Sequence, residues 1–405
     1  MAKLFIAADD FTGALDTGVK FASQGIEARV VNEINDTDDA QVTVINLNSR
    51  HLSRDAAYEV TLAACKKALK AGFDCIYIKT DSGLRGNIGA ALEAAAKASG
   101  DSVIFAPAYP ALNRRTQGGI HMIGSLPVTQ SVFGRDLLNP VKFDRTQDII
   151  AQQTDMQVVI NGEEASSPSH IRLLELNTDE AMLSYAESHK NNHGKVYAGC
   201  AGFAAVMDML LGLKTGKASK PLLKLPLLIL SASMSLVNIK QLRYGENHGF
   251  KSIRFEDVLS TQPDYDKLVS EAQGCGHGYI IESSRSLDEV DELSKKGEQM
   301  GLDAAARGDR ISKNMGLTAK KFLDSGFDGT LCLFGGDIVM EALSVLNCFC
   351  LLPVYEAEPG VVVSRALIKE KQNNKQITIV TKSGSFGSEA VINTLAEEFT
   401  HENQK

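Results

Sequence analysis

The stretch Leu4-Phe5-Ile6-Ala7-Ala8-Asp9-Asp10-Phe11-Thr12-Gly13-Ala14 runs from an apolar segment through two acids into a helical pattern. A short apolar run bounded by polar residues predicts a buried strand over Leu4–Ala7, with a helix after the acids. The same succession recurs along the chain, because short β-branched or apolar runs alternate with longer amphipathic stretches. This alternation is typical of mainly parallel sheets covered by helices, so we predict an α/β fold.

The predicted strands form two groups along the chain. The first group is Leu4–Ala7, Arg29–Val31, Val42–Leu47, Cys75–Lys79, Val103–Ala106, Val158–Ile160, Leu173–Leu176 and Val196–Gly199. The second group is Leu227–Leu230, Ser252–Phe255, Tyr279–Glu282, Leu331–Phe334 and Thr378–Val380. The amphipathic stretches between them predict helices that include Arg54–Ala71, Ser286–Arg307 and Ser388–Phe399.

The length of the chain indicates two domains. Its 405 residues exceed what one hydrophobic core usually serves, and two domains of about 200 residues each are the natural division. Residues 212–226 are rich in Lys, Gly and Pro and follow neither the helix period nor the strand period. We therefore predict an N-terminal domain over 1–211, a linker over 212–226 and a C-terminal domain over 227–405.

Composition and charge exclude several classes of protein. Hydrophobic residues make up 44% and charged residues 23% of the chain, which is ordinary for a globular protein. The formal net charge of -8 repels polyanions, so we expect no nucleic-acid partner. The seven cysteines form no CxxC motif, which indicates reduced thiols. No apolar run approaches the ~18 residues of a membrane span, and Leu4–Ala8 is too short for a signal peptide, so we expect a cytoplasmic protein without a membrane partner. The oligomeric state stays open, with a homodimer as one option.

The acids after the first predicted strand are a candidate site, because open parallel sheets bind ligands outside the carboxyl ends of their strands. Asp9 and Asp10 would repel each other unless a cation or sugar hydroxyls used them. Thr12 and Gly13 leave backbone N–H groups available at the helix start. The alternative is a helix N-cap beside a solvated acid.

A second candidate site is the run Lys79-Thr80-Asp81-Ser82-Gly83-Leu84-Arg85-Gly86-Asn87, which also lies between a strand and a helix. An Arg there could bind a carboxylate through two bonds, and an Asp could orient or deprotonate a hydroxyl. The two glycines indicate a close approach by another group. The alternative is a surface turn with an internal Asp–Arg pair.

A third candidate is the stretch Pro107–Gly119, in which we predict a long loop because it follows neither period. Long ordered loops in compact domains are usually functional. Its two arginines and two glycines favour anion binding, and a solvated lid is the alternative.

Three polar loops in the second half have the same setting between a strand and a helix. They are Ser231–Ser235, Phe334–Asp337 and Thr381–Gly387. Each places a helix N-terminus where it can face an anion, and together they resemble a nucleotide site built from backbone N–H groups. The chain has no GxxxxGK[ST] motif, which excludes a P-loop protein, and no GxGxxG after the first strand, which disfavours a dinucleotide site.

In these motifs the chain resembles the four-carbon acid sugar kinases over nearly its whole length. Four segments show the resemblance, and they follow one another in the same order as in the family. They are Ala8–Ala14, Lys79–Asn87, Pro107-Ala108-Tyr109-Pro110 with Arg115 and Thr116, and Thr381–Gly387. It implies an N-terminal domain that holds a four-carbon aldonic or 3-oxo-aldonic acid and a C-terminal domain that holds ATP. Transfer to the terminal hydroxyl of the acid would occur in the cleft between the domains.

The motifs supply the positioning groups and the positive charge that phosphoryl transfer needs, and we hypothesise the following roles for individual residues. Asp10 and Asp81 would hold the hydroxyls of the acid, with one of them as the catalytic base. Arg85 and Arg115 would hold the substrate carboxylate, and Lys79 or Lys382 would offset phosphate charge. The full acid-binding set is Asp9, Thr12, Lys79, Ser82, Arg85, Gly86, Asn87, Arg115 and Thr116. The nucleotide-binding set is Ser231, Ser233, Ser235, Gly335, Gly336, Asp337, Ile338, Lys382, Gly384 and Gly387. Mg²⁺ is expected with ATP, and no residue is assigned to hold it.

Four positions depart from the family pattern. Ala232 stands where the family usually has Gly, Asp337 where it commonly has Glu, Ile338 where it commonly has Thr, and Gly83 where Thr is more usual. Asp337 keeps the charge on a shorter side chain, whereas Ile338 loses a hydroxyl. One alternative is therefore a sugar-acid-binding regulator that has kept the fold and lost turnover. Another is a dehydrogenase or aldolase acting on similar acids, since α/β folds host many chemistries. The choice among D-threonate, D-erythronate and 3-oxo-tetronate stays open.

Overall fold

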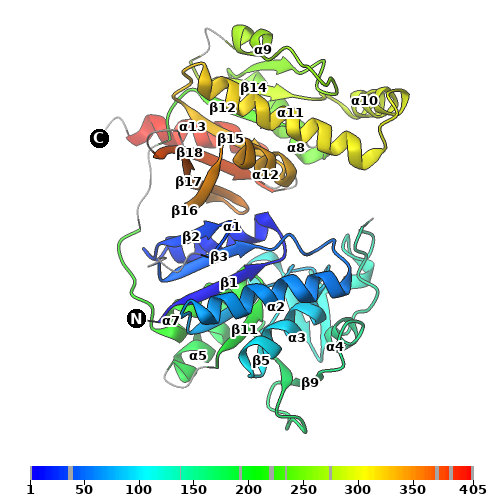
Figure 1. The fold of residues 1–405 in the computed structure, drawn as a ribbon, viewed down its shortest axis with the longest axis vertical. Helices are drawn as coiled ribbons and strands as arrows, with labels where there is room; N and C mark the ends of the chain where they lie inside the picture. Colours follow the sequence, from blue (N-terminus) through cyan, green and yellow to red (C-terminus); the bar gives the residue numbers. More distant parts are fainter. Residues whose placement is uncertain are drawn as a thin grey trace. The chain divides into compact units, whose positions relative to one another are not determined.

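The computed structural model describes residues 2–34, 40–136, 138–190, 194–218, 223–232, 235–272, 276–369, 374–382 and 386–402. Contacts divide the chain into two compact units, a first unit over 1–218 and a second unit over 219–405. Each unit has its own sheet with helices packed on it (Figure 1). The prediction of two α/β domains is confirmed.

The sheet of the first unit is wholly parallel, with the strand order β2-β3-β1-β4-β11-β5-β10-β9. The strands are β1 (Leu4–Ala8), β2 (Ala28–Val31), β3 (Val42–Asn46), β4 (Cys75–Lys79), β5 (Val103–Ala106), β9 (Gln157–Ile160), β10 (His170–Leu173) and β11 (Val196–Gly199). Ala8 at the end of β1 pairs with Asn46 of β3 and with Lys79 of β4. The loops that follow these three strands therefore leave the sheet side by side.

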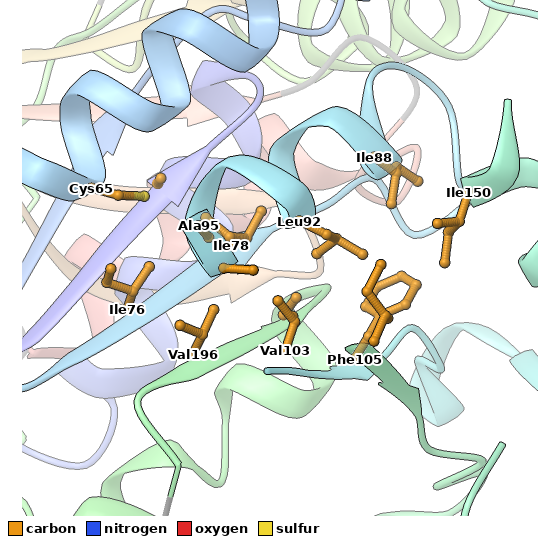
Figure 2. Close-up of a cluster of buried hydrophobic side chains, with 14 of the residues drawn as sticks. Cys65, Ile76, Ile78, Ile88, Leu92, Ala95, Val103, Phe105, Ile150 and Val196 are labelled. Atoms are coloured by element: carbon orange, nitrogen blue, oxygen red, sulfur yellow. The ribbon is translucent and has the colours of Figure 1, made fainter. Parts of the chain in front are cut away.

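Helices cover both faces of this sheet. They are α1 (Phe11–Ala22), α2 (Arg54–Lys70), α3 (Ile88–Ser99), α4 (Thr146–Ala151), α5 (Asp179–His189), α6 (Ala201–Ala204) and α7 (Met207–Leu211). Helix α2 packs on α3. Figure 2 shows Ile76 and Ile78 of β4 together with Leu92 of α3 in the buried hydrophobic cluster on this face of the sheet. Tyr77, which points to the opposite face, meets Phe203 of α6, and α6 packs on α1. Lys79, two residues after Tyr77, therefore points to the face of α1.

A small antiparallel sheet lies within the first unit and consists of β6 (Arg114–Gln117), β7 (Ile120–Ile123) and β8 (Leu126–Pro127). The prediction of Pro107–Gly119 as an irregular loop is wrong in part, because the stretch contains β6 and the 3₁₀ turn Pro110–Leu112. The segment Arg114–Gln117 has no apolar alternation, so it carries no strand signal. The strand predicted at Leu173–Leu176 is also wrong in its bounds, because the structure places it at His170–Leu173.

The sheet of the second unit has the order β13-β14-β12-β15-β18-β17-β16. Its strands are β12 (Leu227–Ser231), β13 (Lys251–Arg254), β14 (Gly278–Glu282), β15 (Thr330–Phe334), β16 (Cys348–Glu358), β17 (Val361–Lys369) and β18 (Asn374–Lys382). Pairing is parallel from β13 to β18 and antiparallel for β18, β17 and β16. The long strands β16 and β17 are absent from the predicted set.

The helices of the second unit are α8 (Leu236–Asn247), α9 (Tyr265–Glu271), α10 (Leu287–Gln299), α11 (Ala304–Asp324), α12 (Gly336–Val345) and α13 (Val391–Glu402). Helix α8 packs on α13, whereas α11 packs on α9, α10 and α12. The helix predicted at Ser286–Arg307 is two helices, because the chain turns at Gly301 and restarts with Asp303 as the N-cap of α11.

Six cysteines lie in the described part of the chain, and all six are buried. Among the helices that the structure describes, none combines the length and the apolar character needed to cross a membrane.

Candidate active site

The acids after β1 gather around one arginine, Arg50. Its Nε and Nη2 donate to the two carboxylate oxygens of Asp9 at 2.8 and 2.9 Å, and its Nη1 lies 2.6 Å from Asp10 Oδ2. Asp81 Oδ1 lies 3.8 Å from Nη2. Burial alone would lower the pKa of Arg50, which is 9% exposed, but the three carboxylates raise it. Arg50 thus stays charged and ties the loop after β1 to the loop after β4.

Besides its contact with Arg50, Asp10 forms the N-cap of α1. Its Oδ1 accepts a hydrogen bond from the backbone N–H of Gly13 at 2.8 Å. The sequence left open whether this segment is a ligand site or a helix N-cap. Asp10 fits both, because it caps α1 and also lies at the carboxyl edge of the sheet. Burial raises the pKa of the neighbouring Asp9, and Arg50 opposes that shift.

Asp81 is buried, and its oxygens are occupied. They accept hydrogen bonds from the backbone N–H groups of Gly83 and Arg85 and from Nε and Nη2 of Arg85, at 2.9 to 3.2 Å. Burial would raise the pKa of Asp81, but Arg85 and Arg50 hold it well below its usual range. Arg85 also donates to Asp136 Oδ2 at 2.8 Å. The guanidinium of Arg85 is thus shared by two carboxylates of the protein.

The two arginines of β6 lie in different surroundings. Arg115 is exposed, whereas the adjacent Arg114 is half-buried and its Nη1 donates to Ser82 Oγ. Arg114 and Arg85 lie over the ring of Phe133, 4.9 and 5.0 Å from its centroid. Within the described part of the chain, Arg114 forms no ion pair, and its Nε has no hydrogen-bond partner. Arg114 is therefore a partly desolvated cation available to an anionic ligand.

Gly83 lies against the same Phe133 ring. A Cβ built on Gly83 would come within 2.3 Å of the ring, a distance that real Cβ atoms do not show. The threonine that the family pattern has at this position would overlap the phenyl group where it lies here.

Thr116 is fully buried and its groups are already bonded. Its backbone N–H donates to Asn177 Oδ1 at 2.8 Å, and its Oγ1 lies 2.9 Å from Nδ1 of His121. Nε2 of His121 lies 3.0 Å from the carbonyl oxygen of Ser82. Burial lowers the pKa of His121 to about 4, so this histidine is neutral at pH 7. Thr116 and His121 fix the small sheet to the loop that carries Ser82.

The remaining predicted acid-site residues also lie near this edge of the sheet. Lys79 is buried at the end of β4, and Thr12 is half-buried in the first turn of α1. Asn87 Nδ2 donates to the carbonyl oxygens of Ser49 and Leu52 at 3.0 and 2.9 Å, and Gly86 packs against Arg50. Asn87 and Gly86 therefore hold the segment that carries Arg50.

The second unit contains a cavity of about 350 Å³ between α10, α11 and the carboxyl ends of β12, β14 and β15. Of the residues predicted for the nucleotide, four line it at the start of α12: Gly335, Gly336, Asp337 and Ile338. Ala232 lines it as well, so three of the departures from the family pattern, Ala232, Asp337 and Ile338, belong to its wall. The N-terminus of α12, a helix of 10 residues, can supply N–H groups to phosphate oxygens there.

Other residues predicted for the nucleotide serve the surrounding structure. Ser231 is buried and accepts a hydrogen bond from Asn238 Nδ2 at 2.7 Å, and Ser235 is the N-cap of α8. The carbonyl of Gly387 accepts from Gln241 Nε2 at 3.0 Å. Ser233 and Gly384 lie outside the described residues.

Lys382, at the end of β18, is next to the cavity wall. Its carbonyl accepts a hydrogen bond from the N–H of Gly335 at 2.9 Å, and its ammonium lies 4.7 Å from the centroid of the Phe334 ring. Burial lowers the pKa of Lys382 to about 8.

Several residues of both candidate sites were not predicted. In the first unit these are Arg50 and His121, and Arg114 was predicted only as one of the two arginines of a possible anion-binding loop. In the second unit they lie on α10 and α11, where Val290, Leu293, Ser294, Ala304, Arg307, Gly308, Ile311 and Ser312 line the cavity. The spacing 304, 307, 308, 311 and 312 places these positions on one face of α11, and that helical period was the available signal.

Two family models match the chain. Residues 4–205 match a sugar-binding N-terminal domain, and residues 228–392 match a nucleotide-binding C-terminal domain.

Similar proteins are known by sequence and by structure. A D-threonate kinase of Salmonella typhimurium is 24% identical over 96% of both chains. A 3-oxo-tetronate kinase of Pectobacterium atrosepticum is 24% identical over 98% of this chain and 100% of the relative. A D-erythronate kinase of Heliobacterium modesticaldum is 30% identical over 39% of this chain and 38% of its own length. A solved structure from Haemophilus influenzae, 19% identical, matches with a TM-score of 0.78 over 98% of this chain and all of its own, so it shares the fold.

Proposed function

Since the chain belongs to the four-carbon acid sugar kinase family, we propose that it transfers the γ-phosphoryl group of ATP to the terminal hydroxyl of D-threonate, D-erythronate or 3-oxo-tetronate. It is a kinase with a hydroxyl acceptor, a sugar acid as one substrate and a nucleotide as the other. The observation that best supports the finer proposal is Arg114, a half-buried guanidinium that forms no ion pair among the described residues and lies near Asp81 of the loop after β4.

We assign the carboxylate of the substrate to Arg114. The sequence prediction gave this role to Arg85 and Arg115. However, Arg85 already binds Asp81 and Asp136, and Arg115 is exposed. An arginine that is partly desolvated and lies over an aromatic ring binds a carboxylate through charge-assisted bonds, which are worth about 1.5–3 kcal/mol each. Arg85 would then contribute by fixing the loop that carries Ser82.

Of the two acids predicted as base, we assign the role to Asp10. The oxygens of Asp81 accept four hydrogen bonds from Gly83 and Arg85, and Asp81 is strongly held in its ionised form. Asp10 is more open, with 28% of its side chain exposed, and it lies at the carboxyl edge of the sheet. Phosphoryl transfer depends mainly on positioning and charge, so a base that orients the attacking hydroxyl is sufficient.

The cavity of the second unit would take the nucleotide. Its apolar wall, formed in part by Leu293 and Ile311, suits a base, and the start of α12 suits phosphates. Asp337 is the one carboxylate among the described residues that line it. Mg²⁺ is commonly held by one or two carboxylates together with substrate phosphates, so Asp337 fits a metal that arrives with ATP. Mg²⁺ would supply charge neutralisation at the phosphates.

A coupled ADP-release assay over a panel of four-carbon acids tests the proposed function. We expect turnover with D-threonate, D-erythronate or 3-oxo-tetronate that requires ATP and Mg²⁺ and leaves nicotinamide absorbance unchanged. Tight binding of one of these acids without ADP release would instead support a regulator, the alternative suggested by Ala232 and Ile338. A homodimer and a cytoplasmic location stay predictions of the sequence.

Substitution of the two neighbouring arginines of β6 tests the carboxylate assignment. We expect Arg114→Ala to raise KM for the acid at least tenfold and KM for ATP less than threefold, because only the acid would lose a charge-assisted contact. Arg115→Ala, which removes an exposed arginine one residue away, is the matched control and should change both KM values less than threefold. A larger acid effect from Arg115→Ala would return the role to Arg115.

A further inference from the structure

The ring of Phe133 lies against two arginines of the candidate acid site. The guanidinium carbons of Arg85 and Arg114 are 5.0 and 4.9 Å from its centroid. Phe133 is 9% exposed and belongs to the buried hydrophobic cluster of the first unit. A cation over an aromatic face is attracted by the ring, and the attraction is stronger where water is excluded. Phe133 therefore gives each guanidinium a buried, directional contact.

The ring matters more for Arg114 than for Arg85. Arg85 also donates three hydrogen bonds to the carboxylates of Asp81 and Asp136, which fix its plane. Among the described residues, the guanidinium of Arg114 has one hydrogen bond, from Nη1 to Ser82 Oγ. Asp81 attracts this guanidinium and Arg85 repels it, but neither charge sets the direction of its plane. Phe133 is therefore the contact that can orient Arg114.

The position of the ring is fixed by the chain around it. The N–H of Phe133 donates to Ser131 Oγ at 3.2 Å, and the carbonyl of Phe133 accepts from the N–H of Val141 at 3.1 Å. Gly83 packs directly against the ring, since a Cβ built there would come within 2.3 Å of it. The ring is thus held between its own segment and the loop after β4, and it can serve as a rigid support.

From these contacts we infer that Phe133 is a positioning residue for the acid, because it holds the plane of the Arg114 guanidinium for the carboxylate. This inference rests on the proposed function, in which Arg114 binds that carboxylate. A carboxylate forms two parallel bonds with a guanidinium only when the two groups are nearly coplanar, so the plane decides the strength of the pair. A ring over one face leaves the N–H groups at the edge of the guanidinium to the ligand.

Steady-state kinetics of Phe133→Leu test the role of the ring, because leucine is apolar but has no aromatic face. We expect KM for the acid to rise about fivefold or more and KM for ATP to change less than about twofold, since only the acid depends on Arg114. Phe133→Tyr keeps the ring, so its KM for the acid should stay within about threefold of the wild type.

Ile149→Val is the matched control for general loosening of the core. Ile149 lies on α4 in the same hydrophobic cluster as Phe133, and the substitution removes one methyl group from it. Both KM values should stay within about twofold of the wild type. A rise in KM for the acid equal to that of Phe133→Leu would overturn the inference, because the loss of packing alone would then explain the effect.

A double-mutant cycle shows whether the ring acts through Arg114. Arg114→Ala has no guanidinium to orient, so the addition of Phe133→Leu should raise KM for the acid by less than about twofold more. A further rise of about fivefold or more would contradict the inference, because the ring would then act on the acid independently of Arg114. If Phe133→Leu does not fold, Phe133→Met is measured in its place with the same criteria.

Unfolding of the same variants separates this inference from the proposed function. If the wild type turns over none of the four-carbon acids, the proposed function fails, whereas the denaturant midpoints of Phe133→Leu, Arg114→Ala and the double variant still test the contact. A shift in the double variant smaller than the sum of the two single shifts would support an interaction of ring and guanidinium. Additive shifts would show that the two side chains do not interact and would overturn the positioning role.

Gly83→Ala displaces the ring without changing it. The added methyl group would overlap the ring, so KM for the acid should rise about fivefold or more here as well. Gly162→Ala is the matched control, because a Cβ on Gly162 meets nothing within 4 Å and its φ lies outside the left-handed region. A KM for the acid that is the same in Gly83→Ala and Gly162→Ala would argue against the role of the ring.

Discussion

Arg50 shows how one side chain outside every motif organises the acids of the first unit. Asp9 and Asp10 are adjacent in sequence and would repel each other, and Asp81 is brought near them by the pairing of β1 with β4. Arg50 contacts all three carboxylates from the loop after β3. Its guanidinium is planar and presents five donors, so it can bind Asp9 through two bonds and still reach Asp10.

Replacing Arg50 by Lys should therefore be costly although the charge is kept. Lysine cannot reproduce the paired bonds to Asp9 or reach Asp10 at the same time, so we expect a loss of about 1–3 kcal/mol in the free energy of unfolding and a kcat at least tenfold lower. Denaturant melts and steady-state kinetics measure both quantities. Arg54→Lys is the matched control, because Arg54 is exposed and its ion pairs are worth little. Equal effects of the two substitutions would argue against the role of Arg50.

At the scale of elements, the small sheet β6-β7-β8 positions Arg114. His121 of β7 connects this sheet to the loop after β4, because its two ring nitrogens bond to Thr116 and to the carbonyl of Ser82. The bond to the carbonyl requires a proton on Nε2, and Nδ1 then accepts from Thr116, so the neutral ring satisfies both partners. Protonation of Nδ1 would turn the Thr116 hydroxyl from donor into acceptor and would place a charge near Arg114.

The pH dependence of stability should report this connection. The pKa of His121 is about 4 in the folded protein and about 6.5 in the unfolded chain, so the unfolded state takes up its proton first as the pH falls. This contribution to stability is present above about pH 6.5 and is lost as the pH falls through about 4. It amounts to up to about 3 kcal/mol, at 1.36 kcal/mol for each pKa unit.

His121→Gln removes the titrating group, so its midpoint of denaturation should change less than that of the wild type between pH 7 and pH 4.5. The denaturant midpoints of both proteins at several pH values measure the difference. Parallel pH curves for the wild type and His121→Gln would contradict the connection.

The elements of this protein were predictable where burial produces a clear pattern. The strands Cys75–Lys79, Val103–Ala106 and Val196–Gly199 were predicted to the residue, because each is a fully or largely buried run in a parallel sheet. The strand Arg114–Gln117 was missed because its side chains are polar and its position depends on a turn and on His121. Helices α10 and α11 were joined in the prediction because both are amphipathic and the turn between them is only a few residues long.

In the candidate site, too, some features could be predicted from the sequence and others could not. The motif residues Asp9, Asp10, Asp81 and Lys79 lie at one sheet edge, as expected from parallel strands that end together. Arg50 could not be predicted, because it is 41 residues away from Asp9 and the contact depends on how the loop after β3 folds back. The different surroundings of Arg114 and Arg115 could not be predicted either, since they depend on which face of β6 points to Ser82.

At the scale of the whole molecule, the chain consists of two units, each with its own sheet and its own candidate ligand site. The residues proposed to bind the acid lie in the first unit, and the residues that line the cavity proposed for the nucleotide all lie in the second. We therefore expect the two ligands to be separable by mutation.

Gly308→Leu tests this separation. Gly308 lies on α11 at the cavity, and an added Cβ meets nothing within 4 Å, so leucine would fill the cavity without a backbone clash. Leucine also favours a helix over glycine by about 0.8–1 kcal/mol, so the fold should not suffer. We expect ATP affinity to fall at least tenfold and acid affinity to stay within threefold, as measured by titration calorimetry. Ala305→Leu, which adds a similar group to an exposed position of α11, is the matched control. Unchanged ATP binding by Gly308→Leu would exclude this cavity as the nucleotide site.

The contact between Gly83 and Phe133 couples two positions that lie 50 residues apart in the sequence. The family resemblance places threonine at position 83, and here the phenyl ring occupies the space that a threonine would need. A threonine at position 83 would therefore be accommodated only if the ring at position 133 moved or gave way to a smaller side chain.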